Sequence, residues 1–197
     1  MARIGFFGGT FNPPTTAHIE LAKKIIQECK IDRVVFVPVN DLYKKDKMVK
    51  SEHRINMLKI ACKDNTGLEV SDIETRNQIE YNAIDIFRII RKQYKNDEIF
   101  FIMGTDNLTK LPNWKEKEEL IKEFKYIILD RGHIQASDII QNNMLLLQNK
   151  NNFKVIKNKR YRNYSSTYIR NQIKYDKIPK NLNIDVYNYI KINNLYT

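Results

Sequence analysis

A loop near the start of the chain carries residue types that suit phosphate chemistry. It follows the apolar run 4–7 and reads Gly8-Gly9-Thr10-Phe11-Asn12-Pro13-Pro14-Thr15-Thr16-Ala17-His18. Adjacent glycines let a ligand approach the backbone closely and tolerate positive φ angles. The helix expected to follow presents N–H groups and a dipole that favour phosphate. His18 lies about one turn into that helix, three residues after Thr15, so we expect both side chains to face the same ligand.

A second loop, toward the end of the chain, suits the same chemistry. The segment Asn163-Tyr164-Ser165-Ser166-Thr167-Tyr168-Ile169-Arg170 follows an apolar run and opens a predicted helix. Hydroxyl and N–H groups at a helix start can hold phosphate oxygens. Arg170 lies one turn after Ser166, where a guanidinium can bind phosphates bidentately. A helix cap explains this loop alone, and a glycine turn with a surface histidine explains the first loop alone. Their joint presence favours a nucleotide site.

Both loops need a scaffold, and the chain alternates strand-like with helix-like segments. Strands that alternate with helices imply right-handed crossovers and a parallel sheet covered on both faces. Ligands of such open sheets bind at the carboxyl ends of the strands, and both loops follow predicted strands. The strand-like runs are 4–7, 33–39, 68–73, 98–103, 125–129 and 153–156.

The helix-like segments show apolar residues three or four positions apart. Two more helices are expected over 114–123 and 139–147, and residues 165–196 read as two helices with Pro179 in the break. We therefore predict one α/β domain over residues 1–197. It should be Rossmann-like, with a central parallel sheet of about six strands, helices on both faces and a C-terminal helical segment. The clearest helical faces are Ile19, Ala22, Ile25, Ile26 and Cys29, then Ile55, Leu58, Ala61 and Cys62, then Ile84, Phe87, Ile90 and Arg91.

Composition narrows the class of protein. The chain has 197 residues, of which 42% are hydrophobic, enough to bury a core without disulfides. Cys29 and Cys62 form no metal or disulfide pattern, which is typical of reduced cytoplasmic proteins. No apolar segment reaches the roughly 18 residues of a membrane helix, and the N-terminal apolar run is too short for a signal peptide. We expect a cytoplasmic protein. The net charge of +11 favours polyanions, which include nucleotides as well as nucleic acids.

The two loops resemble the signatures of a known enzyme superfamily. Residues 8–18 are similar to the GG-(S/T)-F-(D/N)-P-x-(H/T)-x-G-H signature of the HxGH nucleotidyltransferases, and residues 165–170 are similar to their ISSTxIR signature. Other segments resemble the nicotinate and nicotinamide mononucleotide adenylyltransferases in particular. These are Pro38-Val39-Asn40-Asp41-Leu42-Tyr43-Lys44-Lys45 with His53-Arg54, Met103-Gly104-Thr105-Asp106-Asn107-Leu108, Leu111-Pro112-Asn113-Trp114, and Tyr189 with Asn194-Leu195-Tyr196.

The resemblance implies direct in-line transfer of AMP from ATP to the phosphate of a pyridine mononucleotide. Pyrophosphate would leave, no covalent enzyme intermediate would form, and Mg²⁺ would be carried by the ATP phosphates. His18 would donate to the α-phosphate, and Thr15 would replace the first histidine of the signature. Lys45, with Lys44 beside it, would counter phosphate charge. The β- and γ-phosphates would be held by Ser165, Ser166 and Arg170.

The same resemblance assigns the rest of the nucleotide site. The ATP-binding loop would consist of Gly8, Gly9, Thr10 and Phe11. Gly104 would allow close approach of the nucleotide, and Asp106 would accept hydrogen bonds from a ribose. Trp114 would stack on the pyridine ring, since its large rigid face suits that contact. Tyr81 and Asn82 would lie near the pyridine substituent.

Departures from the pattern leave the acceptor open. Ala17 replaces the usual glycine, and Asn12 replaces the commoner aspartate. Tyr81-Asn82 stands where bacterial nicotinate-type enzymes have Tyr-Thr, whereas Tyr43-Lys44-Lys45 looks like the eukaryotic-type enzymes that accept both the acid and the amide. The sequence therefore decides neither between nicotinate and nicotinamide mononucleotide nor on a homo-oligomeric state.

Other functions compete with this interpretation. A pantetheine-phosphate adenylyltransferase or a cytidylyltransferase would share the loops, but neither is expected to carry the Leu-Pro-x-Trp or Tyr-Lys-Lys segments. Residues 157–164 interleave cations with aromatic rings, as single-strand RNA binders do. Because this stretch leads into the second loop, a positive field for ATP explains it equally well. A catalytically silent nucleotide sensor is disfavoured, because His18, Lys45 and Arg170 are all present.

Overall fold

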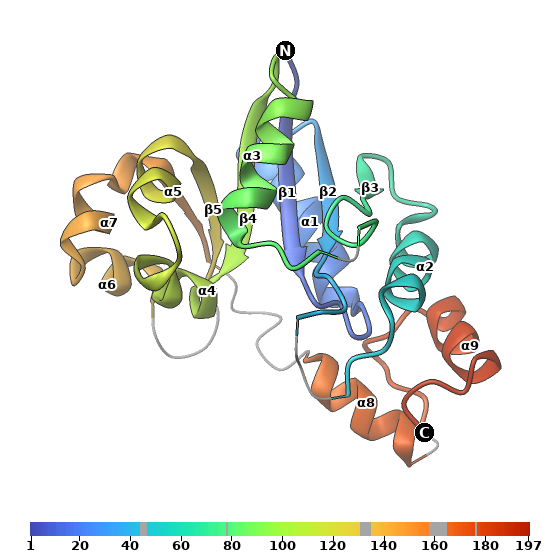
Figure 1. Ribbon diagram of the computed structural model, residues 1–197. Helices are drawn as coiled ribbons and strands as arrows, with labels where there is room; N and C mark the ends of the chain where they lie inside the picture. Colours follow the sequence, from blue (N-terminus) through green and yellow to red (C-terminus); the bar gives the residue numbers. More distant parts are fainter. Residues whose placement is uncertain (44–46, 78, 131–134, 158–164, 176) are drawn as a thin grey trace. The chain divides into compact units, whose positions relative to one another are not determined.

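The structure is a computed structural model that describes residues 1–43, 47–77, 79–130, 135–157, 165–175 and 177–197. The strands form one sheet in the order β3 (Leu68–Val70), β2 (Arg33–Pro38), β1 (Arg3–Gly9), β4 (Glu98–Gly104), β5 (Lys125–Leu129) and β6 (Phe153–Ile156) (Figure 1). The pairs β2–β3, β1–β4, β4–β5 and β5–β6 are parallel. The predicted α/β class with a six-stranded parallel sheet is confirmed.

The chain divides into two compact units. Unit 1 comprises residues 1–8 and 81–162, and unit 2 comprises residues 9–80 and 163–197. The single domain expected over residues 1–197 stays a prediction. Unit 1 contains α3 (Ala83–Gln93), α4 (Thr105–Lys110), η1 (Leu111–Asn113), α5 (Lys117–Glu123), α6 (Ala136–Gln141), α7 (Met144–Gln148) and η2 (Lys150–Asn152). Unit 2 contains α1 (Thr16–Cys29), α2 (Ser51–Cys62), α8 (Ser166–Lys174) and α9 (Ile184–Ile192).

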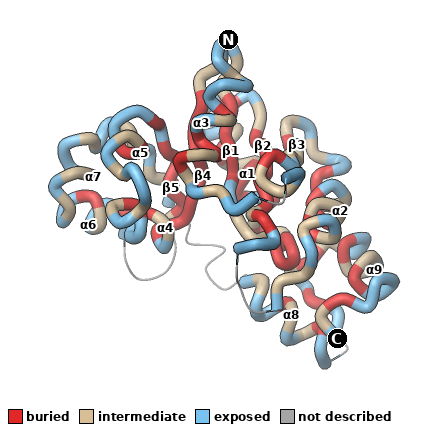
Figure 2. Tube along the Cα trace, in the orientation of Figure 1, coloured by how far each residue is buried: buried red, intermediate tan, exposed pale blue. Residues whose placement is uncertain are grey.

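An aromatic row crosses the strands of unit 1. The parallel register pairs Phe6 of β1 with Phe101 of β4, then Phe101 with Tyr126 of β5, then Tyr126 with Phe153 of β6. Side chains at paired positions lie on the same face of a sheet, so these rings are neighbours. Phe87 of α3 stacks on Phe101 and covers the middle of the row. This packing fixes α3 against β4. The four rings of the row are buried, and the strands β4 and β5 that carry two of them are largely buried along their length (Figure 2).

Unit 2 is built around β2, with α1 and α2 packed against it and α9 packed against α2. The face of α1 predicted from Ile19, Ala22, Ile25 and Cys29 is buried, whereas Ile26 is half-buried. Gly67, before β3, has φ of 81°, and a Cβ there would lie 3.2 Å from Ile26 Cδ1 and 3.3 Å from the Asp32 carbonyl oxygen. Glycine is therefore required at this turn for both backbone conformation and space.

Three predicted elements differ from the observed ones. The strand expected over 68–73 ends at Val70, because the chain then turns, with the Thr75 N–H donating to the Asp72 carbonyl oxygen. The helix expected over 114–123 begins at Lys117, since Glu116 takes a left-handed φ of 54°. The helix expected over 139–147 is two short helices, α6 and α7, because Asn143 caps α7 by accepting the Leu146 N–H.

The buried face of α2 is rotated from the predicted one. Ile55 is half-buried, and the buried side chains are Arg54, Met57, Leu58, Ala61 and Cys62. These positions also follow helical spacing. Because the first of them is an arginine, the set does not show as a purely apolar pattern in the sequence. The two helices predicted over 165–196 are confirmed as α8 and α9, with Pro179 between them. In the described ranges no helix is long and apolar enough to cross a membrane.

Candidate active site

His18 lies in the first turn of α1 and is held by the residue that caps the helix. The backbone N–H of Thr15 donates to His18 Nδ1 at 2.9 Å, and Thr15 Oγ1 lies 3.0 Å from the same nitrogen. An N–H can only donate, so Nδ1 accepts and the neutral ring carries its proton on Nε2. The structure thus fixes one tautomer of His18, with Nε2–H as a hydrogen-bond donor.

Thr15 differs from the expectation that it faces a ligand together with His18. Its relative exposure is 1%, and its hydroxyl contacts the imidazole. The physical reason is its position as N-cap of α1, where the side chain folds back over the first turn. Thr15 therefore orients His18 in this structure, while its direct contact with a ligand stays a prediction.

The two glycines of the first loop have different surroundings. Gly8 is exposed, and a Cβ there would meet no atom within 4 Å. A Cβ on Gly9 would lie 2.9 Å from Phe11 Cζ, so Gly9 makes room for this ring. Phe11 is buried, packs edge-on against His18 with ring centroids 5.2 Å apart, and itself has a φ of 47°. The left-handed conformation expected at a glycine is thus adopted by Phe11, and of the described glycines only Gly67 has it.

The second loop is docked on the first within unit 2. Arg170 Nη1 donates to the Asn12 carbonyl oxygen at 2.8 Å, and Ser166 Oγ donates to the Pro13 carbonyl oxygen at 2.8 Å. Ser165 is the N-cap of α8, and its Oγ accepts the Tyr168 N–H at 3.1 Å. The sequence predicted that these loops act together, and the structure brings them into contact. The hydroxyl proton of Ser166 is engaged by the protein itself.

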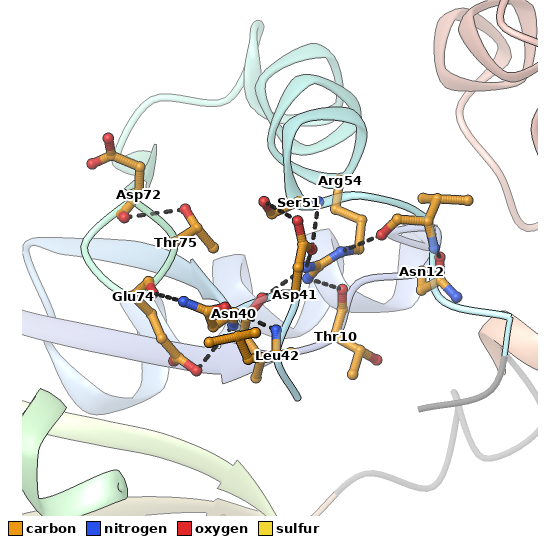
Figure 3. A network of polar contacts seen from close by, with 12 residues as sticks. Thr10, Asn12, Asn40, Asp41, Leu42, Ser51, Arg54, Asp72, Glu74 and Thr75 are labelled. Atoms are coloured by element: carbon orange, nitrogen blue, oxygen red, sulfur yellow. Dashed lines mark hydrogen bonds and ion pairs between the residues drawn. The ribbon is translucent and has the colours of Figure 1, made fainter. Parts of the chain in front are cut away.

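Arg54 is a charged side chain with 0% exposure that binds three loop carbonyls (Figure 3). Its guanidinium donates to the carbonyl oxygens of Thr10 at 3.1 Å, Val39 at 2.7 Å and Val49 at 3.0 Å. It also pairs with Asp41 Oδ1 at 2.8 Å. The planar five-donor fork of arginine suits this set of acceptors, whereas lysine has a single point charge. Arg54 thereby joins the first loop to the chain at Val39, after β2, and at Val49, before α2.

Asn40 and Glu74 form the neighbouring part of this network (Figure 3). The backbone N–H of Asn40 donates to Glu74 Oε1 at 3.1 Å, and Asn40 Nδ2 donates to the Glu74 carbonyl oxygen at 2.9 Å. Burial raises the pKa of Glu74 to about 7, although the Asn40 hydrogen bond and the charge of Arg54 act in the opposite direction. The carboxyl group beside Asn40 therefore changes charge near neutral pH.

Unit 1 holds the residues predicted to bind the nucleoside parts. Gly8 and Gly104 lie at the carboxyl ends of the adjacent parallel strands β1 and β4. Gly104 is the N-cap of α4, and Asp106 is exposed in the first turn of that helix. Asp106 therefore lies at the edge of the sheet where open parallel sheets bind their ligands, and its contact with a ribose stays a prediction.

The residues predicted to contact the pyridine ring also lie in unit 1. Trp114 is half-buried directly after η1, and Tyr81 is half-buried before α3. Asn82 is the exposed N-cap of α3, and its backbone N–H donates to Asp85 Oδ2 at 2.9 Å, which is the return bond of the capping box. Asn82 therefore has a structural role as a helix cap. Lys44, Lys45 and residues 158–164 of the basic segment lie outside the described residues.

The sequence analysis placed Asn40 and Arg54 in segments that resemble the family without assigning either a contact, and it missed Glu74. Arg54 carried a usable signal, because it lies three and four residues before Met57 and Leu58 and so on the buried face of α2. Asn40 and Glu74 are 34 positions apart and had no such signal. Their pairing depends on the tertiary fold alone.

We expect Arg54→Met to lower the free energy of unfolding by about 3 kcal/mol, because three loop carbonyls lose their donor and Asp41 loses its cationic partner. Urea denaturation checks this. Arg76→Met is the matched control, since Arg76 is exposed and pairs only at the surface with Asp72. A loss in Arg54→Met no larger than that of the control would contradict the role of Arg54.

Glu74 predicts a pH dependence of stability. With its pKa raised to about 7, the folded state binds this proton more tightly than the unfolded state does, so stability is fully present below about pH 4.5 and falls as the pH rises to 7. Wild type should therefore lose on the order of 3 kcal/mol of unfolding free energy between pH 4.5 and 8 that Glu74→Gln, which has no carboxyl group here, does not lose. Urea denaturation at both pH values measures this. Glu52→Gln, which removes an exposed carboxylate of α2, is the control. If the stability difference between Glu74→Gln and wild type is the same at both pH values, the predicted pH dependence is wrong.

Comparisons with known proteins bear on the same site. The family model described as cytidylyltransferase-like matches residues 6–172. The probable nicotinate-nucleotide adenylyltransferase of Carboxydothermus hydrogenoformans is 32% identical over 199 residues, covering 99% of this chain and 98% of that protein. The nicotinate-nucleotide adenylyltransferase of Bacillus subtilis is 30% identical over 133 residues, covering 66% of this chain and 70% of that protein.

A solved structure shares the fold. The Plasmodium falciparum nicotinic acid mononucleotide adenylyltransferase complexed with NaAD has a TM-score of 0.81 at 22% identity, covering 100% of this chain and 98% of that chain. The matched family model includes the loops at residues 8–18 and 165–170, and the Carboxydothermus relative covers nearly the whole chain. The chain therefore belongs to the cytidylyltransferase-like family and, within it, to the nicotinate-nucleotide adenylyltransferases.

Proposed function

We propose that this protein transfers the AMP part of ATP to nicotinate mononucleotide, which yields the dinucleotide and pyrophosphate for NAD biosynthesis. The observation that supports this most directly is His18, whose Nδ1 accepts the Thr15 N–H and whose Nε2–H is consequently a donor at the start of α1. An imidazole in this tautomer suits a developing negative charge on phosphate. The family of the chain supplies the acceptor class.

The proposed reaction is a single in-line displacement. An oxygen of the acceptor phosphate forms a bond to the α-phosphorus, and the bond to the bridging oxygen of pyrophosphate breaks. Because no protein group is bonded to the substrate, catalysis rests on positioning and on charge stabilisation. His18 would donate to an α-phosphate oxygen, and Ser165, Ser166 and Arg170 would orient the β- and γ-phosphates. Lys44 and Lys45 are proposed to counter phosphate charge.

The substrate is proposed to be Mg²⁺-bound ATP, with the ion carried by its phosphates. Thr10 and Phe11 shape the loop that receives it, and Gly8 allows its close approach. In unit 1, Asp106 is proposed to accept ribose hydroxyl groups, Gly104 to admit the nucleotide, and Trp114 to stack on the pyridine. The start of α3, Tyr81 and Asn82, is proposed to contact the pyridine carboxylate. The proposed location is the cytoplasm.

The acceptor is tested by pyrophosphate release from Mg²⁺-bound ATP, with nicotinate mononucleotide and nicotinamide mononucleotide offered separately. We expect release with nicotinate mononucleotide at least tenfold faster in kcat/KM than with the amide, equivalent to about 1.4 kcal/mol of transition-state binding. A chain incubated without acceptor is the blank. Release only with phosphopantetheine or another phosphorylated acceptor would overturn the proposed substrate.

His18→Ala should lower kcat by about 10²- to 10³-fold while the Kd for ATP changes less than about threefold, because the Nε2–H bond strengthens as charge develops in the transition state. Steady-state kinetics and calorimetric ATP binding measure the two quantities. Thr15→Val, which keeps the backbone N–H bond to Nδ1, should lose less than about tenfold in kcat. Equal losses of turnover and ATP affinity in His18→Ala would exclude the assigned role.

A further inference from the structure

A phenol from the C-terminal segment reaches the first phosphate loop. Tyr196 Oη donates to Asn12 Oδ1 at 2.7 Å, across 184 positions of the chain and within unit 2. Asn12 has 2% exposure, so this bond is made inside the protein. Neither residue belongs to the groups assigned above to substrate binding. The contact therefore needs an explanation of its own.

The backbone around Tyr196 shows that the phenol is held in place. Leu195 is buried, and its N–H donates to the Ile190 carbonyl oxygen of α9 at 3.0 Å. Tyr196 itself has a φ of 66°, a left-handed conformation that a side chain rarely adopts without other constraints. Burial raises the pKa of Tyr196, with the charges of Arg170 and Arg54 acting the other way. The hydroxyl thus stays protonated and acts as a donor at neutral pH.

Asn12 connects Tyr196 to Arg170, the arginine proposed to orient the β- and γ-phosphates. Its Oδ1 also accepts the Val49 N–H at 3.2 Å, and its Nδ2 donates to the Lys47 carbonyl oxygen at 2.9 Å. The amide plane is thereby set from both ends, with the Tyr196 bond the shortest of the three. The backbone carbonyl of the same residue accepts Arg170 Nη1. A rotation of the Asn12 peptide would therefore move the guanidinium.

We propose that Tyr196 is a positioning residue for ATP binding, which acts through Asn12 on Arg170 and on the loop that leads to His18. This inference rests on the proposed function only for the identity of the acceptor, because ATP binding is measurable without any acceptor. The unit 1 residues assigned to the pyridine mononucleotide take no part in the contact. Tyr196 should then affect the ATP half of the reaction selectively.

The test compares Tyr196→Phe with Tyr189→Phe. The control removes a phenol hydroxyl that also makes two side-chain contacts in unit 2, to His53 Nδ1 at 3.0 Å and to Asn56 Nδ2 at 3.1 Å, but does not touch the loop. We expect Tyr196→Phe to raise the calorimetric Kd for Mg²⁺-bound ATP about fivefold and to lower kcat/KM for ATP roughly tenfold. The KM for nicotinate mononucleotide should stay within about twofold. Tyr189→Phe should change none of these by more than about twofold, while both variants lose similar Tm.

A double-mutant cycle with Asn12→Ala shows whether the effect passes through Asn12. If it does, Tyr196→Phe adds less than about twofold to the loss in kcat/KM for ATP already caused by Asn12→Ala, whereas independent effects would multiply. Multiplying effects, or a Tyr196→Phe variant that binds ATP like wild type, would overturn the proposal. If wild type turns over neither pyridine mononucleotide, the proposed function fails, and the ATP Kd values still decide the role of Tyr196.

Discussion

The guanidinium of Arg54 is the constraint on which the loop conformations of unit 2 depend. A buried cation is costly unless hydrogen-bonded acceptors surround it, and here backbone carbonyls from residues 10, 39 and 49 supply them. The same carbonyls lie in irregular loop structure, where no helix or sheet ladder supplies them with donors. Arginine and loops therefore stabilise each other, so a loop without regular secondary structure adopts one conformation.

The first loop uses its own backbone carbonyls as anchors for the second. The carbonyl oxygens of Asn12 and Pro13 accept hydrogen bonds from Arg170 and Ser166, which hold both donor side chains against the first loop. Donor groups set in advance stabilise developing charge without reorganisation during the reaction. His18 is set in advance in the same way, because the backbone N–H of the N-cap residue Thr15 donates to Nδ1 and so selects the imidazole tautomer.

Unit 1 reaches rigidity in a different way. Its aromatic row of Phe6, Phe101, Tyr126 and Phe153 follows from the parallel register, and α3 covers it through Phe87. Close packing of large rings leaves few alternative arrangements. The carboxyl ends of β1 and β4, with Gly8 and Gly104, are therefore carried by a stiff sheet. Asp106 follows at the start of α4 and inherits this fixed position.

The sequence by itself determined the α/β class and the presence of all six strands, and it singled out the two loops and His18 as candidates for phosphate binding. These features are local: strands show as apolar runs, and each loop is a short segment with its chemistry in consecutive residues. It misjudged the end of β3 and the starts of α5 and α7, where single residues such as Glu116 and Asn143 set the boundary through backbone conformation or capping.

Only the tertiary structure decided which side chains serve the loops. The contacts of Arg54 with Thr10, Asn40 with Glu74 and Tyr196 with Asn12 join positions 44, 34 and 184 residues apart. Helical spacing can mark Arg54 as buried, but no local pattern in the sequence identifies the partner in any of these three hydrogen bonds. Their existence depends on burial, which removes water as the competing partner and makes each unsatisfied group costly. The candidate site residues therefore lie in short consecutive segments that the sequence shows, whereas their positions in space depend on residues distant in the chain.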